Sequence, residues 1–145
     1  MSIVQPEVRS GRPLILVADR NALIRKVIRT MLIGQGFHVL LAPTAQHALK
    51  VVTRLTGRLD LIIVEAAMSA AAGFNIIERV SGLSPRMPLL LMCSQLREEA
   101  LAPSPRRDYI AKPFTQGLLL EKIRGLIGSA ARPVTGLYRT ASPAS

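Results

Sequence analysis

Short apolar runs alternate with segments of helical period along most of this chain. Unbroken runs rich in Leu, Ile and Val predict five strands. They cover residues 14–18, 37–42, 59–65, 87–94 and 109–114. Apolar residues at every third or fourth position predict a helix after each strand. The five predicted helices cover residues 21–34, 44–55, 73–83, 95–102 and 115–128.

This alternation predicts a single domain of the α/β class, in which helices cover both faces of an open parallel sheet. The third run, "LDLIIVE", is apolar without a break, which indicates a strand buried on both faces. The fourth helix is expected to be short because Pro103 and Pro105 stop it. The domain is expected to span residues 13–128, with a flexible arm at 1–12 and a flexible basic tail at 129–145.

The first helix is predicted to turn an apolar face to the core and a basic face to solvent. Its apolar positions recur at helical spacing, and they are Leu23, Ile24, Val27, Ile28, Met31 and Leu32. Arg25, Lys26 and Arg29 fall between them on the solvent side. Gly34 or Gly36 is expected to supply the left-handed residue that ends the helix.

The composition suits one domain with an aliphatic core. The chain has 145 residues, of which 49% are hydrophobic and only 3% aromatic. No apolar run approaches the roughly 18–20 residues of a membrane span, and the N-terminus lacks the apolar centre of a secretory signal. The single cysteine, Cys93, excludes an internal disulfide bond and is typical of a reducing compartment. We therefore expect a cytoplasmic protein that does not engage membranes.

The charge is strongly basic, with a net charge of +10 and a pI near 11.3. Such a surface favours an anionic partner, which could be nucleic acid, a membrane or an acidic protein. Aromatic residues for stacking on bases are scarce, the arginines are spread evenly along the chain, and no DNA-binding motif is present. Nucleic-acid binding is therefore an alternative interpretation and not the leading one.

Residues able to carry chemistry stand at the carboxyl ends of the predicted strands, where sheets of this kind place their ligands. They are Asp19, Arg20, Glu65, Cys93 and Lys112. Glu65 is followed by a loop, residues 66–72, that consists of alanine with one methionine and one serine. A lone carboxylate at the end of a buried strand therefore needs an explanation.

Residues 13–128 resemble the receiver domains of bacterial response regulators, the CheY-like family. The stretches that carry the resemblance are "LILVADRNALIRKVI", "DLIIVEAAMSAAAG", "MPLLLMCS" and "DYIAKPFT". The resemblance implies a doubly wound, flavodoxin-like sheet of five parallel strands. It also implies transfer of a phosphoryl group from a partner histidine to an aspartate, with Mg²⁺ held by a pair of acids.

The residues at the family's functional positions depart from that pattern. By resemblance, Glu65 stands at the phosphoacceptor, and Arg20 replaces the second acid of the pair that begins with Asp19. Cys93 replaces the Thr or Ser whose hydroxyl follows the phosphoryl group, and a thiol is a weaker hydrogen-bond partner.

Two of the family's features, which comprise three residues, are retained. The lysine–proline turn is present as Lys112 and Pro113, and Tyr109 stands at the position of the switching aromatic residue.

These departures predict that the site holds no Mg²⁺ and needs no other cofactor. The charge of Arg20 repels a divalent ion twice as strongly as a monovalent one. The longer side chain of Glu65 moves the carboxylate by roughly 1 Å, and a misplacement of that size can cost about 100-fold in rate. We expect Lys112 and Arg20 to hold Glu65 instead, with Asp19 alongside, in a permanent ion-pair cluster.

The leading interpretation is a stand-alone, atypical receiver (a pseudo-receiver) of two-component or phosphorelay signalling. It is expected to act without phosphorylation and without enzymatic activity, by binding a protein such as a histidine kinase or a phosphotransfer protein. The candidate partner face is the basic side of the first helix, with Arg25, Lys26 and Arg29.

Several alternatives stay open at this stage. Glu65 could act as a weak phosphoacceptor, or the protein could be a basic accessory protein that binds nucleic acid. Cys93 is expected to be a packed strand-end residue; the alternative is a redox sensor whose pKa is lowered by Lys112. The sequence decides neither between an active-like and an inactive-like state nor the oligomeric state.

Overall fold

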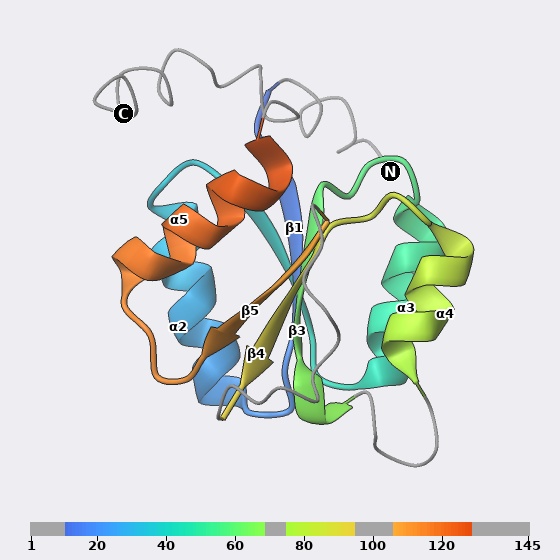
Figure 1. Cartoon of the computed structure of the whole chain (residues 1–145), viewed down its shortest axis with the longest axis horizontal. Coiled ribbons are helices and arrows are strands. Elements are labelled where there is room, and N and C mark those ends of the chain that lie inside the picture. Colours follow the sequence, from blue (N-terminus) through green and yellow to red (C-terminus); the bar gives the residue numbers. More distant parts are fainter. Residues whose placement is uncertain (1–10, 69–74, 95–105, 129–145) are drawn as a thin grey trace.

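The computed structural model describes residues 11–68, 75–94 and 106–128. Their five strands are parallel and form one sheet in the order β2-β1-β3-β4-β5, as predicted for a doubly wound fold (Figure 1). The strands are β1 (Leu14–Ala18), β2 (His38–Ala42), β3 (Leu61–Glu65), β4 (Leu89–Cys93) and β5 (Arg107–Ala111).

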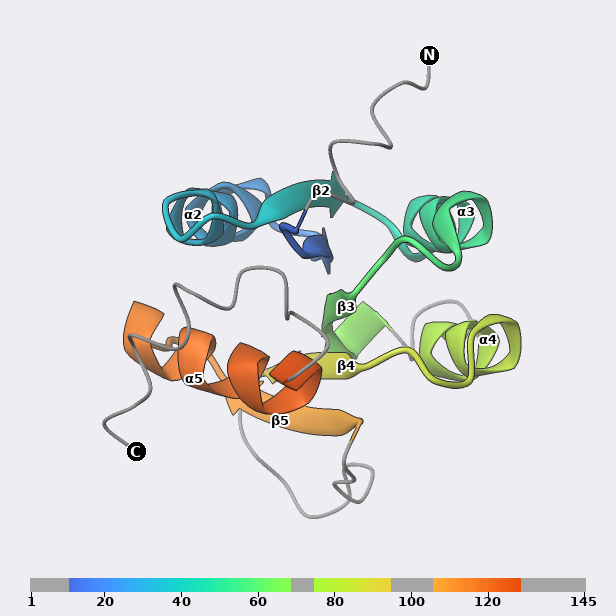
Figure 2. The same cartoon turned by 90° about the horizontal axis from the view of Figure 1, so that it is seen from above.

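The helices cover both faces of this sheet, which confirms the predicted layers. Seen from above, α2 and α5 lie on one side of the sheet, and α3 and α4 lie on the other (Figure 2). Their bounds are α2 (Ala22–Ile33), α3 (Ala45–Leu55), α4 (Ile76–Leu83) and α5 (Gln116–Ile127). Each begins at an Asn or Thr whose side-chain oxygen accepts backbone N–H groups of the first turn.

Alternate residues of the central strands fill two separate cores. On the α2–α5 side, Ile15 and Ile63 pack with residues such as Ile28 and Ile123. On the other side, Leu16, Ile62 and their neighbours pack against α3 and α4. β1 is buried along its whole length and β3 up to Glu65, so the predicted burial of the third strand on both faces is confirmed.

The predicted fifth strand was wrong at both ends. It begins at Arg107, two residues earlier than the apolar pattern indicated, because Arg107 and Asp108 pair in register with Leu89 and Leu90. Charged residues fit there because β5 is an edge strand and only partly buried. The strand ends at Ala111, so the lysine–proline turn lies beyond it.

The predicted core face of α2 was also too wide. Ile28 and Leu32 are buried, whereas the side chains of Leu23 and Val27 are 66% and 42% exposed. The helix ends at Ile33, and the residue that caps it, Gly34, has a right-handed backbone conformation. The left-handed glycine is Gly36, in the turn that follows.

Some predictions fall outside the described residues. These are the shortened fourth helix, most of the alanine-rich loop after Glu65, the N-terminal arm up to residue 10, and the C-terminal tail. Among the helices within residues 11–68, 75–94 and 106–128, none has the length and apolar character required to cross a membrane.

Candidate functional site

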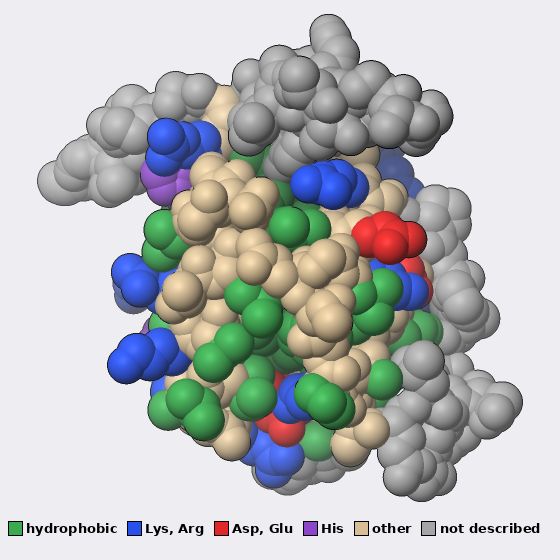
Figure 3. Space-filling view, turned by 90° about the vertical axis from the view of Figure 1, so that its left-hand side faces the viewer, with side chains coloured by type: hydrophobic (Ala, Val, Ile, Leu, Met, Phe, Trp, Pro, Cys, Tyr) green, Lys and Arg blue, Asp and Glu red, His purple; other side chains and the backbone are tan. Residues whose placement is uncertain are grey.

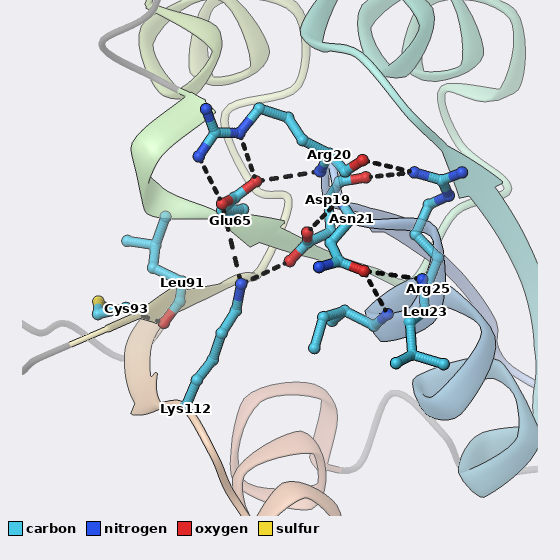
Figure 4. A network of polar contacts seen from close by, with 10 residues as sticks. Asp19, Arg20, Asn21, Leu23, Arg25, Glu65, Leu91, Cys93 and Lys112 are labelled. Atoms are coloured by element: carbon cyan, nitrogen blue, oxygen red, sulfur yellow. Dashed lines mark hydrogen bonds and ion pairs between the residues drawn. The ribbon is translucent and has the colours of Figure 1, made fainter.

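The carboxyl ends of β1, β3 and β5 bring the predicted polar residues together. Asp19 and Arg20 follow β1, Glu65 ends β3, and Lys112 follows β5. β1 and β3 are direct neighbours in the sheet, so Glu65 lies beside the Asp19–Arg20 turn. The Lys112 side chain reaches across from the β5 side into the same space (Figure 4). We call these four residues the carboxyl-end cluster.

Arg20 holds both carboxylate oxygens of Glu65. The guanidinium Nε donates to Oε1 at 3.1 Å, and the terminal Nη2 donates to Oε2 at 2.9 Å. The backbone N–H of Arg20 also donates to Oε1, at 3.0 Å. The Glu65 side chain is only 12% exposed, whereas that of Arg20 is 60% exposed. The guanidinium thus lies over the carboxylate in a two-pronged geometry that fixes its orientation.

Lys112 is bound mainly by Asp19. Its Nζ lies 2.8 Å from Oδ2 of Asp19 and 3.8 Å from Oε2 of Glu65. The Asp19 side chain is fully buried, and its other oxygen accepts the backbone N–H of Asn21 at 2.8 Å. The ion-pair cluster expected from the sequence is therefore confirmed, with Arg20 as the principal partner of Glu65 and Lys112 as the principal partner of Asp19.

Arg25 stabilises this site from the first turn of α2, a role that the sequence pattern did not predict. Its guanidinium donates to the backbone carbonyl oxygens of Asp19, at 2.7 Å, and Arg20, at 3.2 Å. Side chains in the first turns of a helix lean back toward its N-terminus, so a long side chain here can reach the preceding loop. Arg25 thus fixes the loop that carries Arg20.

The contacts lower the pKa of Glu65. The main cause is the hydrogen bond from the Arg20 side chain, helped by the Arg20 backbone N–H and the charge of Lys112 and opposed by burial. The same pairing raises the pKa of Arg20. Both groups are therefore charged at neutral pH, as the ion pair requires.

The lowered pKa of Glu65 predicts a pH-dependent loss of stability in acid. A carboxylate with a depressed folded-state pKa stabilises the fold fully above its unfolded-state pKa, near 4.5. That stabilisation is lost as the pH falls from there through the folded-state pKa. Urea unfolding between pH 6 and pH 3 should therefore show a smaller pH dependence in a Glu65→Gln variant than in the wild type. Identical pH profiles for the two proteins would contradict the pairing.

Cys93 lies at the edge of the site, where its backbone oxygen accepts the N–H of Lys112 at 2.8 Å while its thiol is turned elsewhere. Its sulfur lies 3.8 Å from the backbone oxygen of Leu91 and is directed away from the Glu65 carboxylate (Figure 4). Burial raises the pKa of the thiol, and the charge of Lys112 only partly opposes this. The alternative of a redox sensor requires a lowered pKa and is therefore not supported, and packing at the end of β4 stays the prediction for Cys93.

Tyr109 lies on β5, half-buried against the core on the α3–α4 side. Burial raises the pKa of its hydroxyl. Its assignment as a switching residue stays a prediction.

The candidate partner face combines basic and apolar side chains. Lys26 and Arg29 are exposed on α2, as predicted, while Arg25 is partly buried against the loop. The exposed Leu23 and Val27 lie on the same helix. Figure 3 shows the α2–α5 side of the molecule, where apolar side chains gather in the lower half, toward the carboxyl ends of the strands.

The carboxylate oxygens that could bind a metal ion at this site already accept hydrogen bonds from within the chain. Both oxygens of Glu65 accept from Arg20, and those of Asp19 accept from Lys112 and a backbone N–H. A second acid, which a hard divalent ion would need, is replaced by Arg20. Within the described ranges, no group of three or more His, Cys, Asp or Glu side chains is placed to hold a metal ion. With two cationic side chains, Arg20 and Lys112, already paired with the two carboxylates, the donor set does not fit Mg²⁺.

Comparison with known proteins extends over most of the chain. The family model described as "Response regulator receiver domain" matches residues 15–124. Response regulator RR06 of Streptococcus pneumoniae is 27% identical over 115 residues, which cover 78% of this chain and 52% of that protein. The DNA-binding transcriptional regulator NtrC of a Bradyrhizobium strain is 31% identical over 134 residues, which cover 90% of this chain and 26% of NtrC. The chain thus spans about half of the first relative and about a quarter of the second.

Solved structures show the same fold. A response regulator receiver domain protein from Clostridium thermocellum aligns with a TM-score of 0.72 and 25% identity. The alignment covers 81% of this chain and 96% of that one.

Proposed function

The chain belongs to the response regulator receiver domain family, and on that premise we propose that it signals without phosphorylation, by binding a protein partner. The observation that supports this proposal is the pair of hydrogen bonds that the Arg20 guanidinium donates to the Glu65 carboxylate. In this arrangement the phosphoacceptor position is already neutralised from within the chain. The site therefore resembles a receiver whose charges are satisfied without metal or phosphoryl group.

We propose further that the site does not use Mg²⁺. To coordinate Glu65, the ion would have to displace a guanidinium that makes two hydrogen bonds with it. It would also have to compete with Lys112 for the buried Asp19. Each displacement would break an ion pair within the protein. It would also leave Arg20 or Lys112 charged beside the metal ion, which that charge repels.

Treatment with acetyl phosphate and Mg²⁺, followed by intact-mass spectrometry, tests the proposal. We expect the wild-type mass to stay unchanged. An adduct of one phosphoryl group (about 80 Da) that is absent from a Glu65→Ala variant would contradict it and would favour a weak acceptor instead. An adduct that persists in the Glu65→Ala variant would mark modification elsewhere and leave the assignment of Glu65 intact.

The partner is proposed to be a histidine kinase or a phosphotransfer protein that docks on α2. An exposed apolar pair, Leu23 and Val27, flanked by the cations Lys26 and Arg29, suits a helical surface with apolar and acidic side chains. Binding at this face requires no catalytic group, so the protein is proposed to be a non-enzymatic signalling module. A cytoplasmic location is part of the same proposal.

Docking on α2 predicts that a Leu23→Asp/Val27→Asp variant loses its partner. Both side chains are exposed, so the variant should fold, while two buried carboxylates in the interface should weaken binding by about 10-fold or more. Quantitative pull-downs from the source cell should recover kinase or phosphotransfer proteins with the wild type and not with the variant. Leu83→Asp, at an apolar residue of α4 that is 45% exposed, serves as the control. Equal recovery with all three proteins would contradict docking on α2.

A further inference from the structure

The loops that lead into the strands carry a row of arginines at the edge opposite the carboxyl-end cluster. Arg12, Arg58, Arg86 and Arg106 precede β1, β3, β4 and β5, and these four strands are consecutive neighbours in the sheet. We call this row the arginine edge. The arginines seemed evenly spread along the sequence, but parallel strands bring four of them to one edge.

Backbone hydrogen bonds hold these loops side by side. Asp60 donates its N–H to the carbonyl oxygen of Leu14 at 2.8 Å, which ties the loop after Arg58 to the start of β1. Leu89, three residues after Arg86, donates to the carbonyl oxygen of Arg106 itself at 2.9 Å. The sheet therefore fixes the backbone at Arg106, and at Leu14 and Asp60, each two residues after an arginine of the row.

Further cations flank the arginine edge. The helices run antiparallel to the strands, so their C-terminal turns point toward this edge and bring Arg54 of α3 and Arg124 of α5 to it. The helix dipole gives both of these arginines a structural role.

Negative charge is scarce at this edge. In the described residues of the loops that lead into the strands, Asp60 is the sole acidic side chain, and its carboxylate accepts the backbone N–H of Leu14 at 2.8 Å. Asp108, the second residue of β5, is a further acid near this edge and pairs with Lys122 at 3.2 Å, whereas Asp19 and Glu65 lie at the other end of the strands. Among the described residues, the arginines of this edge therefore outnumber its acidic side chains.

The length of the row is sufficient to reach several phosphates of a nucleic-acid backbone. Neighbouring strands lie about 4.8 Å apart, so four adjacent strands span roughly 14 Å. One strand of a duplex presents a phosphate about every 3.4 Å along the helix axis, or about four phosphates over that length. Guanidinium groups bind phosphate oxygens in a two-pronged manner and are the preferred side chains for this contact.

We propose that the arginine edge binds the phosphate backbone of double-stranded nucleic acid, without regard to base sequence. Single strands fit less well, because Phe37, the aromatic residue that leads into β2, is buried and offers no platform for stacking bases. A lipid surface fits less well, because the exposed Ile33 and Leu83 belong to α2 and α4, on opposite faces of the sheet, and form no common apolar patch. This proposal is independent of the function proposed for the carboxyl-end cluster.

Fluorescence anisotropy with the full chain and a labelled duplex of arbitrary sequence tests the proposal. Micromolar binding is expected near 50 mM salt, with an affinity that falls roughly 150-fold by 200 mM for about four phosphate contacts. An Arg12→Gln/Arg86→Gln variant, changed at two exposed positions, should reduce the slope of log affinity against log salt by about 2. The matched control, Lys50→Gln/Arg79→Gln, loses the same charge from the middle of α3 and α4 and should keep the wild-type slope.

Three results would overturn the proposal. One is absence of duplex binding near 50 mM salt. Another is an equal decrease of the salt slope in the arginine-edge variant and in the control, which would mean that only the net charge of the protein matters. The third is binding to phosphatidylserine vesicles without binding to the duplex, which would assign the edge to a lipid surface.

Discussion

An Arg20→Asp/Glu65→Asp variant is expected to gain what the wild type lacks: binding of Mg²⁺ and acceptance of a phosphoryl group. The variant removes the guanidinium that neutralises the acceptor and restores a second acid beside Asp19. Three carboxylates would then face Lys112 alone, so the metal-free variant should be less stable than the wild type because like charges repel. Mg²⁺ should reverse that effect.

Thermal unfolding measures how much Mg²⁺ stabilises the double variant. At a Mg²⁺ concentration of about 100 times the dissociation constant, binding stabilises the folded state by about 2.7 kcal/mol, which corresponds to a rise in Tm of roughly 10 °C. Acetyl phosphate should then add about 80 Da to the variant. Arg20→Gln, which removes the cation without adding an acid, is the control and should respond weakly to Mg²⁺. If the wild type and the double variant respond alike, Arg20 does not exclude the metal.

Lys112→Met is expected to destabilise the fold by about 3 kcal/mol at neutral pH. It leaves the fully buried Asp19 without its cation, and loss of one partner of a buried pair costs about 3–5 kcal/mol. The lower end applies because the Lys112 side chain is 22% exposed and water can partly replace it. Adding Asp19→Asn should recover most of the loss, since a neutral amide needs no counter-charge.

Urea unfolding gives the free energies, and a second lysine of the chain supplies the control. Lys122 pairs with Asp108 at 3.2 Å, but both side chains are well exposed, at 29% and 38%. Lys122→Met should therefore cost no more than about 1 kcal/mol. A Lys112→Met variant that is as stable as Lys122→Met would show that Asp19 does not depend on its partner.

Much of the fold could be predicted because the sequence pattern matches the physics of a parallel sheet. Residues such as Leu16 and Ile62 lie in strands buried on both faces, and unbroken apolar runs are characteristic of such strands. The pattern is weaker where burial is partial. Arg107 and Asp108 belong to an edge strand, where charged side chains reach solvent, so an apolar run could not mark where β5 begins.

The buried face of α2 was predicted too wide for a different reason. Helical spacing shows which residues share a face, but it does not show how wide the contact with the sheet is. Leu23 and Val27 fit the period and yet lie beyond the edge of that contact. Their exposure could be found only from the packing of the whole helix against the sheet.

The sequence predicted which residues meet at the candidate site, but it did not predict which cation pairs with which carboxylate. Strand ends in a parallel sheet meet at one edge, so Asp19, Glu65 and Lys112 could be expected to meet. Which cation binds which carboxylate depends on a difference of about an ångström between the 2.8 Å and 3.8 Å contacts of Lys112, and no spacing rule reaches that precision. The reach of Arg25 back to the loop carbonyls likewise depends on the direction of one side chain.

A crystal structure determined with Mg²⁺ and beryllofluoride in excess would show whether Arg20 excludes both ligands, because beryllofluoride mimics a bound phosphoryl group. We expect the Arg20 guanidinium to stay within hydrogen-bonding distance of both Glu65 oxygens, as at 2.9 Å and 3.1 Å here, with neither ligand bound. An ordered Mg²⁺ and a beryllofluoride on the Glu65 carboxylate, with Arg20 displaced, would contradict this expectation.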